Sequence, residues 1–218
     1  MKTSAVITFP LLIFFLLVAL TASSVGGKNE AVIDSEWKPV KANTPYLVLG
    51  FMSRDSEYLS RETFARNATS CRERPVLNYL HILPDRAEPI MFVLPSSSSP
   101  DDVVRVSTEL NIKFTNPSRC NESGFWRVSG FDDKTLFETV LQDGSESRSD
   151  STFTIRRTNP YTRYKFYFGS SSSADLGDNS TEIVGDEIHG KNLVLKTRRA
   201  ARRRRIEIEV HFVKPRGQ

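Results

Sequence analysis

The chain has 218 residues, of which 39% are hydrophobic and 26% are charged, a balance that favours a folded core over disorder. Its net charge of +4 comes from one segment, because removing the six arginines of residues 198–205 from the 30 basic residues leaves 24, against 26 acidic residues. A dedicated nucleic-acid binder usually spreads its positive charge over a whole face, so the composition argues against that class of protein.

Residues 1–24 have the layout of a secretory signal peptide. Lys2 precedes an apolar stretch, residues 5–20, and small residues suited to cleavage follow it. The stretch has 16 residues and contains Pro10, whereas a bilayer-spanning helix needs about 20. We therefore expect no transmembrane segment, and we expect residues 25–218 to form a single domain that is secreted to the extracellular space, cell wall or vacuole.

Short runs rich in β-branched and aromatic residues recur along the rest of the chain, with polar turns between them. The run "IEIEVHF" alternates apolar and polar residues, as a half-buried antiparallel strand does. About twelve short strands without helical periodicity predict an all-β sandwich, barrel or β-trefoil, and the pattern alone does not choose among these. The predicted strands lie near residues 46–50, 76–83, 90–94, 103–107, 110–114, 125–129, 136–141, 152–157, 162–168, 182–188, 192–196 and 206–212.

The cysteines and the N-x-[ST] sequons fit a secreted protein. In an oxidising compartment the isolated pair Cys71 and Cys120 is expected to form one disulfide. Asn67, Asn121 and Asn179 each begin a sequon and are candidate glycosylation sites.

No group of residues predicts catalysis. The histidines His81, His189 and His211 are not spaced with another histidine or a cysteine for metal binding. The chain also lacks a G-x-S-x-G nucleophile motif and a glycine-rich phosphate loop. We therefore expect a protein that is not an enzyme, without catalytic residues, metal or cofactor.

Residues 32–48, "VIDSEWKPVKANTPYLV", resemble the N-terminal signature of the Kunitz-type inhibitors of the soybean trypsin inhibitor family. The signature places an Asp after an aliphatic residue, then a Pro–aliphatic pair, then a Tyr that starts a strand. The likeness continues through residues 101–114, which are similar to two strands of miraculin-like members, and extends to Phe212. It implies a β-trefoil of about twelve antiparallel strands in a secreted, monomeric plant protein that inhibits an endopeptidase. Cys71 and Cys120 stand where this family has its first disulfide.

The sequence departs from the family pattern in two places. Trp37 occupies a turn position where the family usually has Gly or Asp, which leaves the geometry of the first turn open. The family's second disulfide has no counterpart, because no cysteine follows residues 162–168.

The resemblance also assigns a protease-binding loop. Family members inhibit with a convex loop between the fourth and fifth strands, which here consists of Ser96, Ser97, Ser98, Ser99, Pro100, Asp101 and Asp102. Trypsin-like enzymes carry a buried carboxylate that binds Arg or Lys, and Pro100 at the tip offers neither. The resemblance thus implies an inhibitor of a serine or cysteine endopeptidase that is not a strong trypsin inhibitor. Asn43 is the nearest candidate for the asparagine that supports this loop, although it is one position out of register.

The arginine segment leaves several hypotheses open. On the same scaffold it falls between the last two strands, as a long hairpin loop that is solvated, binds a polyanion, or is cut by a processing protease. A polyanion site would bind acidic polysaccharide or anionic lipid. The second hypothesis for function is therefore a non-inhibitory β-trefoil that binds a polyanion or carbohydrate in stress or defence. Its binding residues would be Arg198, Arg199, Arg202, Arg203, Arg204 and Arg205.

Overall fold

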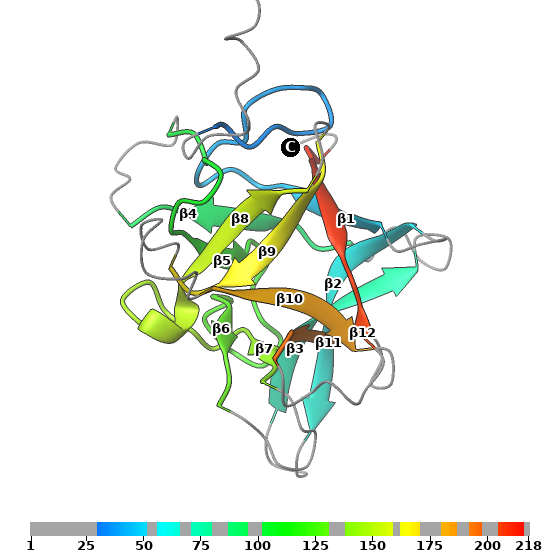
Figure 1. Cartoon of the computed structure of the whole chain (residues 1–218). Coiled ribbons are helices and arrows are strands. Elements are labelled where there is room, and N and C mark those ends of the chain that lie inside the picture. Colours follow the sequence, from blue (N-terminus) through cyan, green and yellow to red (C-terminus); the bar gives the residue numbers. More distant parts are fainter. Residues whose placement is uncertain are drawn as a thin grey trace, which may run out of the picture.

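The computed structural model describes residues 30–51, 56–65, 71–79, 87–95, 102–130, 138–158, 162–170, 180–186, 192–197 and 205–215. This part of the chain contains thirteen strands and one short 3-10 helix, Ser149–Ser151 (Figure 1). The strands are β1 (Leu47–Phe51), β2 (Ser56–Ala65), β3 (Cys71–Tyr79), β4 (Ile90–Val93), β5 (Asn111–Phe114), β6 (Arg127–Val128), β7 (Val140–Leu141), β8 (Phe153–Arg157), β9 (Tyr164–Phe168), β10 (Thr181–Asp186), β11 (Asn192–Leu195), β12 (Arg205–Ile206) and β13 (Glu209–Val213). None of the described residues belongs to a helix that is long and apolar enough to span a membrane.

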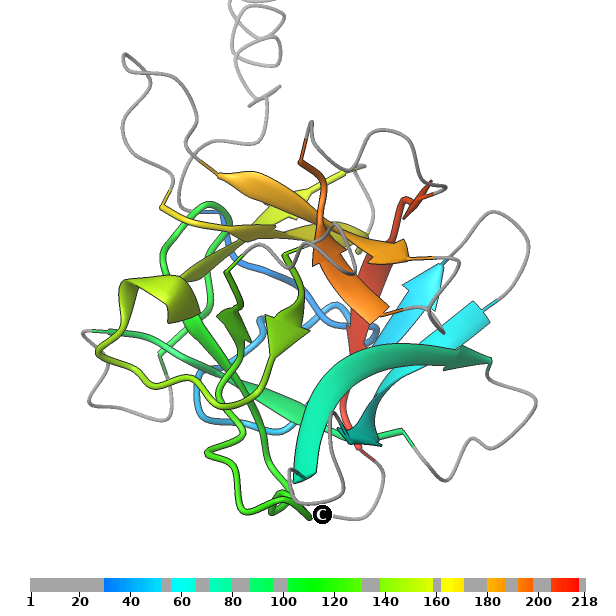
Figure 2. The same ribbon diagram turned by 90° about the horizontal axis from the view of Figure 1, so that it is seen from below.

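Seven strands form a closed barrel in the order β10-β11-β3-β2-β1-β13-β9, because β9 also pairs with β10. All strand pairs are antiparallel. The pairs β4–β5 and β6–β7 form two separate two-stranded sheets. Figure 2 shows the curvature of β3, which makes a long hairpin with β2. The prediction of an all-β fold is confirmed, and closure removes the free edges of these seven strands.

The sequence pattern missed β2 and misjudged two other segments. β2 reads "SEYLSRETFA", and its polar outer half shows no apolar alternation because it pairs with β3 outside the core. Residues 103–107 are not a strand: they make only single bridges to Ala31 and Lys41. The predicted strand 206–212 is two strands, because β12 pairs with β10 whereas β13 pairs with β1 and β9.

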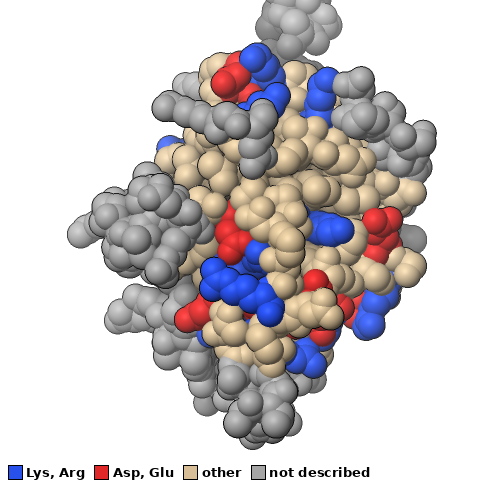
Figure 3. All heavy atoms as spheres, turned by 180° about the vertical axis from the view of Figure 1, so that it is seen from behind, with Lys and Arg blue, Asp and Glu red and all other residues tan. Residues whose placement is uncertain are grey.

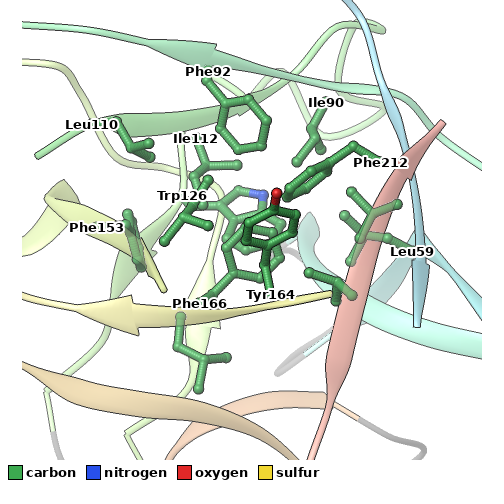
Figure 4. Packing of buried hydrophobic residues seen from close by; sticks show 14 of the residues in the cluster. Leu59, Ile90, Phe92, Leu110, Ile112, Trp126, Phe153, Tyr164, Phe166 and Phe212 are labelled. Atoms are coloured by element: carbon green, nitrogen blue, oxygen red, sulfur yellow. The ribbon is translucent and has the colours of Figure 1, made fainter. Parts of the chain in front are cut away.

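One contiguous core joins strands from the whole chain, and aromatic rings dominate it (Figure 4). Trp126 lies with its ring 6.0 Å from those of Phe114 and Phe153 and 5.6 Å from that of Phe166. Phe212 connects this group to β4, where its ring meets Phe92 edge-on at 5.2 Å. Such ring pairs stabilise the core by more than the burial of their apolar area alone would. The core therefore fixes β4 and β5, the two strands that flank the assigned loop.

Candidate functional site

The assigned loop connects β4 with the segment that leads into β5. Residues 96–101 lie outside the described residues, so the structure places the two stems of the loop and its last residue, Asp102. The incoming stem is β4 with Leu94 and Pro95, and the outgoing stem is residues 102–106. The site can therefore be judged by how these stems are held.

A single segment, residues 40–46, binds both stems. The backbone N–H of Asn43 donates to the carbonyl of Phe92 on the incoming stem at 2.8 Å. The N–H of the preceding residue, Ala42, donates to the carbonyl of Asp102 on the outgoing stem at 2.7 Å. Adjacent residues of one segment thus hold the two ends of the loop, which fixes the spacing between the stems.

Further hydrogen bonds lock this segment to the stems away from the loop. Tyr46 and Ile90 exchange both backbone hydrogen bonds, at 2.8 and 2.9 Å. The N–H of Val104 donates to the carbonyl of Val40 at 2.8 Å. The hydroxyl of Tyr46 also accepts from the N–H of Lys41 at 3.1 Å, so the segment is tied to itself as well. Because Tyr46, Ile90, Val40 and Val104 are all buried, these bonds are shielded from competing water.

Asn43 adopts a left-handed backbone conformation with φ of 54°. Asparagine tolerates this region better than most residues do, and the conformation turns the chain between Ala42 and Thr44. The hydroxyl of Thr44 donates to the Ala42 carbonyl at 3.3 Å and closes the same turn. The structure thus places the Asn43 backbone between the two stems, while the supporting role of its side chain stays a prediction.

The first turn forms despite Trp37. The buried carboxylate of Asp34 accepts from the N–H groups of Glu36 at 2.9 Å and Lys38 at 3.0 Å. The N–H of Trp37 donates to the Asp34 carbonyl at 3.1 Å, and Trp37 itself is left-handed with φ of 62°. Asp34 therefore imposes the turn, and the tryptophan adopts the backbone conformation that glycine adopts most easily.

Cys71 and Cys120 form the expected disulfide, with their Cα atoms 5.2 Å apart. It joins the start of β3 to residues 117–122, which follow β5. Asn121, next to this disulfide, is exposed and left-handed with φ of 56°, so its sequon is sterically open. Asn67 and Asn179 lie outside the described residues, and glycosylation stays a prediction at all three positions.

Sequence reasoning missed a buried ionic cluster beside the disulfide. Glu73 is only 2% exposed. Its Oε2 accepts from the Ser118 hydroxyl at 2.7 Å, the Arg119 N–H at 3.1 Å and Nε2 of Gln142 at 2.6 Å. The Arg61 guanidinium lies 3.6 Å away, and its side chain is 4% exposed. The local sequence "CRERP" resembles a solvated strand, and only the tertiary fold brings these groups together.

The arginine segment is mostly outside the described residues, which include only Arg205 of its six arginines. Arg205 donates from Nη2 to the Thr197 carbonyl at 2.6 Å and so ties the two ends of the segment together. The expected hairpin is wrong, because β11 and β12 each pair with β10 and not with each other. Figure 3 shows basic and acidic side chains interleaved on the back of the molecule, so positive charge is not a general property of that face. The polyanion site stays a prediction.

Two lysines and two glutamates form a charge cluster beside the two ends of the arginine segment. Lys196 bonds Glu182 at 2.7 Å and Glu207 at 2.8 Å. Lys165 bonds the same two carboxylates, at 2.6 and 3.0 Å. Hydrogen bonds from Lys196 and Lys165 lower the pKa of Glu207 from 4.5 to about 2. The Glu207 carboxylate thus stays ionised at mildly acidic pH.

This cluster predicts how stability responds to acid. Because the pKa of Glu207 is lower in the folded chain than in the unfolded chain, its contribution is full above about pH 4.5 and disappears as the pH falls through about 2. An NMR titration of the Glu207 carboxyl should give a midpoint near 2. In a Lys165→Met, Lys196→Met variant the midpoint should return toward 4.5, and a wild-type midpoint already near 4.5 would contradict the cluster.

The described residues contain no group of three or more His, Cys, Asp or Glu side chains arranged to hold a metal ion. Of the three histidines, the structure describes His211, which lies in β13 with its ring 5.2 Å from that of Phe51. Burial and the nearby Arg163 lower the pKa of His211. This histidine is therefore packed and neutral at physiological pH, as a structural residue is.

Comparisons with known proteins agree with these features. The Kunitz legume family model, described as trypsin and protease inhibitor, matches residues 32–212. Kunitz trypsin inhibitor 6 of Arabidopsis thaliana is 37% identical over 95% of this chain and 96% of its own length. Kunitz trypsin inhibitor 7 of the same plant is 43% identical over 73% of this chain and 77% of its own length.

A solved structure confirms the β-trefoil. The Kunitz-type cysteine protease inhibitor from potato superimposes with a TM-score of 0.62 at 17% identity, and covers 87% of this chain and all of its own. At this identity the likeness shows the fold alone, whereas the match to the family model over most of the chain shows the family. The chain belongs to the Kunitz-type trypsin and protease inhibitor family, the soybean trypsin inhibitor family that its sequence resembles.

Proposed function

We propose that the protein is a secreted inhibitor that blocks the cleft of an endopeptidase with residues 96–102. The observation that carries the proposal is the attachment of both loop stems to residues 40–46, through the bonds Asn43–Phe92 and Ala42–Asp102. A loop whose ends are already fixed loses less conformational entropy on docking, so its contacts convert more efficiently into affinity. The protein needs no metal or cofactor for this action.

The target differs from trypsin. Residues 96–102, "SSSSPDD", contain no Lys or Arg for the carboxylate of a trypsin-like pocket. Two aspartates in the loop would also be repelled by that carboxylate. We propose a serine or cysteine protease whose specificity pocket accepts a small, neutral residue. The potato protein of the same fold is named a cysteine protease inhibitor, which supports testing that class.

Secretion is part of the proposal. The signal-peptide pattern of residues 1–24, the three sequons and the Cys71–Cys120 disulfide support passage through an oxidising secretory pathway. The curated relatives come from Arabidopsis and from Theobroma cacao, which supports action in a plant. A protease inhibitor in the cell wall or vacuole would act in defence.

The test is inhibition of trypsin, chymotrypsin, elastase, subtilisin and papain by residues 25–218. We expect inhibition of at least one enzyme other than trypsin. Replacing residues 96–101 with Gly-Ser repeats of equal length should raise its inhibition constant by about 100-fold or more, because the docked contacts and their preorganisation are both lost.

The matched control makes the same replacement in another serine-rich segment, residues 171–176, and should leave inhibition unchanged. Inhibition that survives the change at residues 96–101 would move the site to another part of the molecule. A folded protein that inhibits none of the five enzymes would overturn the proposal.

A further inference from the structure

The side chain of Trp37 contributes to neither the core nor the hydrogen bonds of its turn. Its side chain is 67% exposed, and it is the large hydrophobic residue that stands exposed in the described part of the chain. Its left-handed backbone, with φ of 62°, is unfavourable for any residue with a Cβ and costs glycine nothing. The hydrogen bonds from Glu36 and Lys38 to Asp34 hold the turn whichever residue stands at position 37.

The surroundings of Trp37 suit recognition of a protein surface. The flanking residues Glu36 and Lys38 pair with each other at 2.7 Å, so their charges are mutually compensated. The exposed indole therefore stands beside a polar pair with no net charge. Tryptophan is enriched among the few residues that dominate protein–protein affinity, and polar neighbours that exclude water commonly surround such residues.

The turn lies within reach of a protease seated on the assigned loop. Residues 34–38 project from the bridge between Ile33 and Pro39, and the same chain continues into residues 40–43, which hold the loop stems. Residues 30–45 and the outgoing stem lie side by side at the end of the molecule shown at the top of Figure 1.

The distance fits the footprint of a protease. Four residues lie between Trp37 and Ala42, so their Cα atoms are at most about 17 Å apart, the length of the extended chain. A standard interface covers about 800 Å² on each partner, or a radius of about 16 Å. Trp37 therefore lies no farther from Ala42, which holds the outgoing stem of the loop, than about the radius of such an interface.

We propose that Trp37 is a peripheral anchor that inserts its indole against an apolar patch beside the active-site cleft of the target protease. This inference rests on the proposed inhibitory function and adds a second point of contact to it. The strained backbone then persists because the side chain adds affinity for the enzyme, although the isolated inhibitor would be more stable with glycine.

Two variants separate the side chain from the strain. Trp37→Ala removes the indole and keeps a Cβ, whereas Trp37→Gly removes the indole and relieves the backbone. Both should raise the inhibition constant about tenfold, and Trp37→Phe should restore most of the affinity. Only Trp37→Gly should raise the melting temperature, by about 2–4 °C for a domain of this size.

The outcomes distinguish this inference from the function on which it rests. If inhibition depends on residues 96–101 and is unchanged in Trp37→Ala and Trp37→Gly, the anchor is wrong and the inhibitory loop stands. If the wild-type protein inhibits no protease, both are wrong. A loss of affinity in both variants, with higher stability in Trp37→Gly alone, is the result that the proposal requires.

Discussion

Replacing Arg61 with methionine is expected to lower the free energy of unfolding by about 3–5 kcal/mol, because the buried Glu73 and the partly buried Glu88 lose their shared cation. Arg61 bonds Glu88 through Nε at 2.6 Å and lies 3.6 Å from Glu73. Glu73 is 2% exposed and Glu88 is 16% exposed. Methionine fills much of the volume of the arginine side chain but carries no charge. The loss of stability therefore comes mainly from the carboxylates that no longer have a cationic partner.

Arg61 also supports the chain that follows β5. Its Nη2 donates to the Pro117 carbonyl at 3.2 Å, and its guanidinium lies 5.0 Å from the centre of the Phe114 ring. Removal of Arg61 therefore weakens the attachment of residues 117–122 as well as the charge balance. Urea unfolding, followed by tryptophan fluorescence, would measure the loss.

Arg74→Met is the matched control, because Arg74 has the same kinds of partner in a solvated setting. It bonds Glu62 at 3.2 Å and lies 4.8 Å from the centre of the Phe64 ring. The Glu62 side chain is 53% exposed, so this ion pair is expected to contribute less than about 1 kcal/mol. Equal losses in the two variants would show that burial of the Arg61 pairs has no special consequence.

The predictable part of this fold was its apolar periodicity. The alternation of Val210 and Phe212 predicted β13, since their side chains alternate toward the core. β2 was missed because its buried residues Glu57, Tyr58, Leu59 and Ser60 are consecutive and do not alternate with exposed ones, while its outer half is defined by its ladder with β3. A hairpin defined by backbone pairing leaves little trace in a hydropathy pattern.

The candidate site also has features that the sequence predicts and features that only the structure shows. The resemblance assigned residues 96–102 and the departure at Trp37, because both are local in sequence. It gave no indication of the cluster around Glu73, whose partners Ser118 and Gln142 are 45 and 69 residues away. The exposure of Trp37 also required the structure, since a tryptophan next to a predicted strand is most often buried.

Removal of the disulfide, by Cys71→Ser with Cys120→Ser, is expected to lower the free energy of unfolding by about 4 kcal/mol. The two cysteines are 49 residues apart, and the estimate follows from the entropy that the cross-link removes from the unfolded chain. Urea unfolding of the double-serine variant tests it. A loss below about 1 kcal/mol would mean that contacts around Glu73 alone keep residues 117–122 in place.

The disulfide and Arg61 should be coupled, because both hold residues 117–122 against β2 and β3. In Arg61→Met the disulfide keeps Glu73 buried beside Ser118, whereas without the disulfide the segment can move and admit water to the carboxylate. The combined loss should therefore be smaller than the sum of the separate losses by about 0.5–3 kcal/mol. Sulfate in the buffer keeps all variants folded for the comparison. The loss of stability caused by Arg74→Met should simply add to the loss caused by removal of the disulfide. If the losses caused by Arg61→Met and by removal of the disulfide were also strictly additive, the two attachments would act independently.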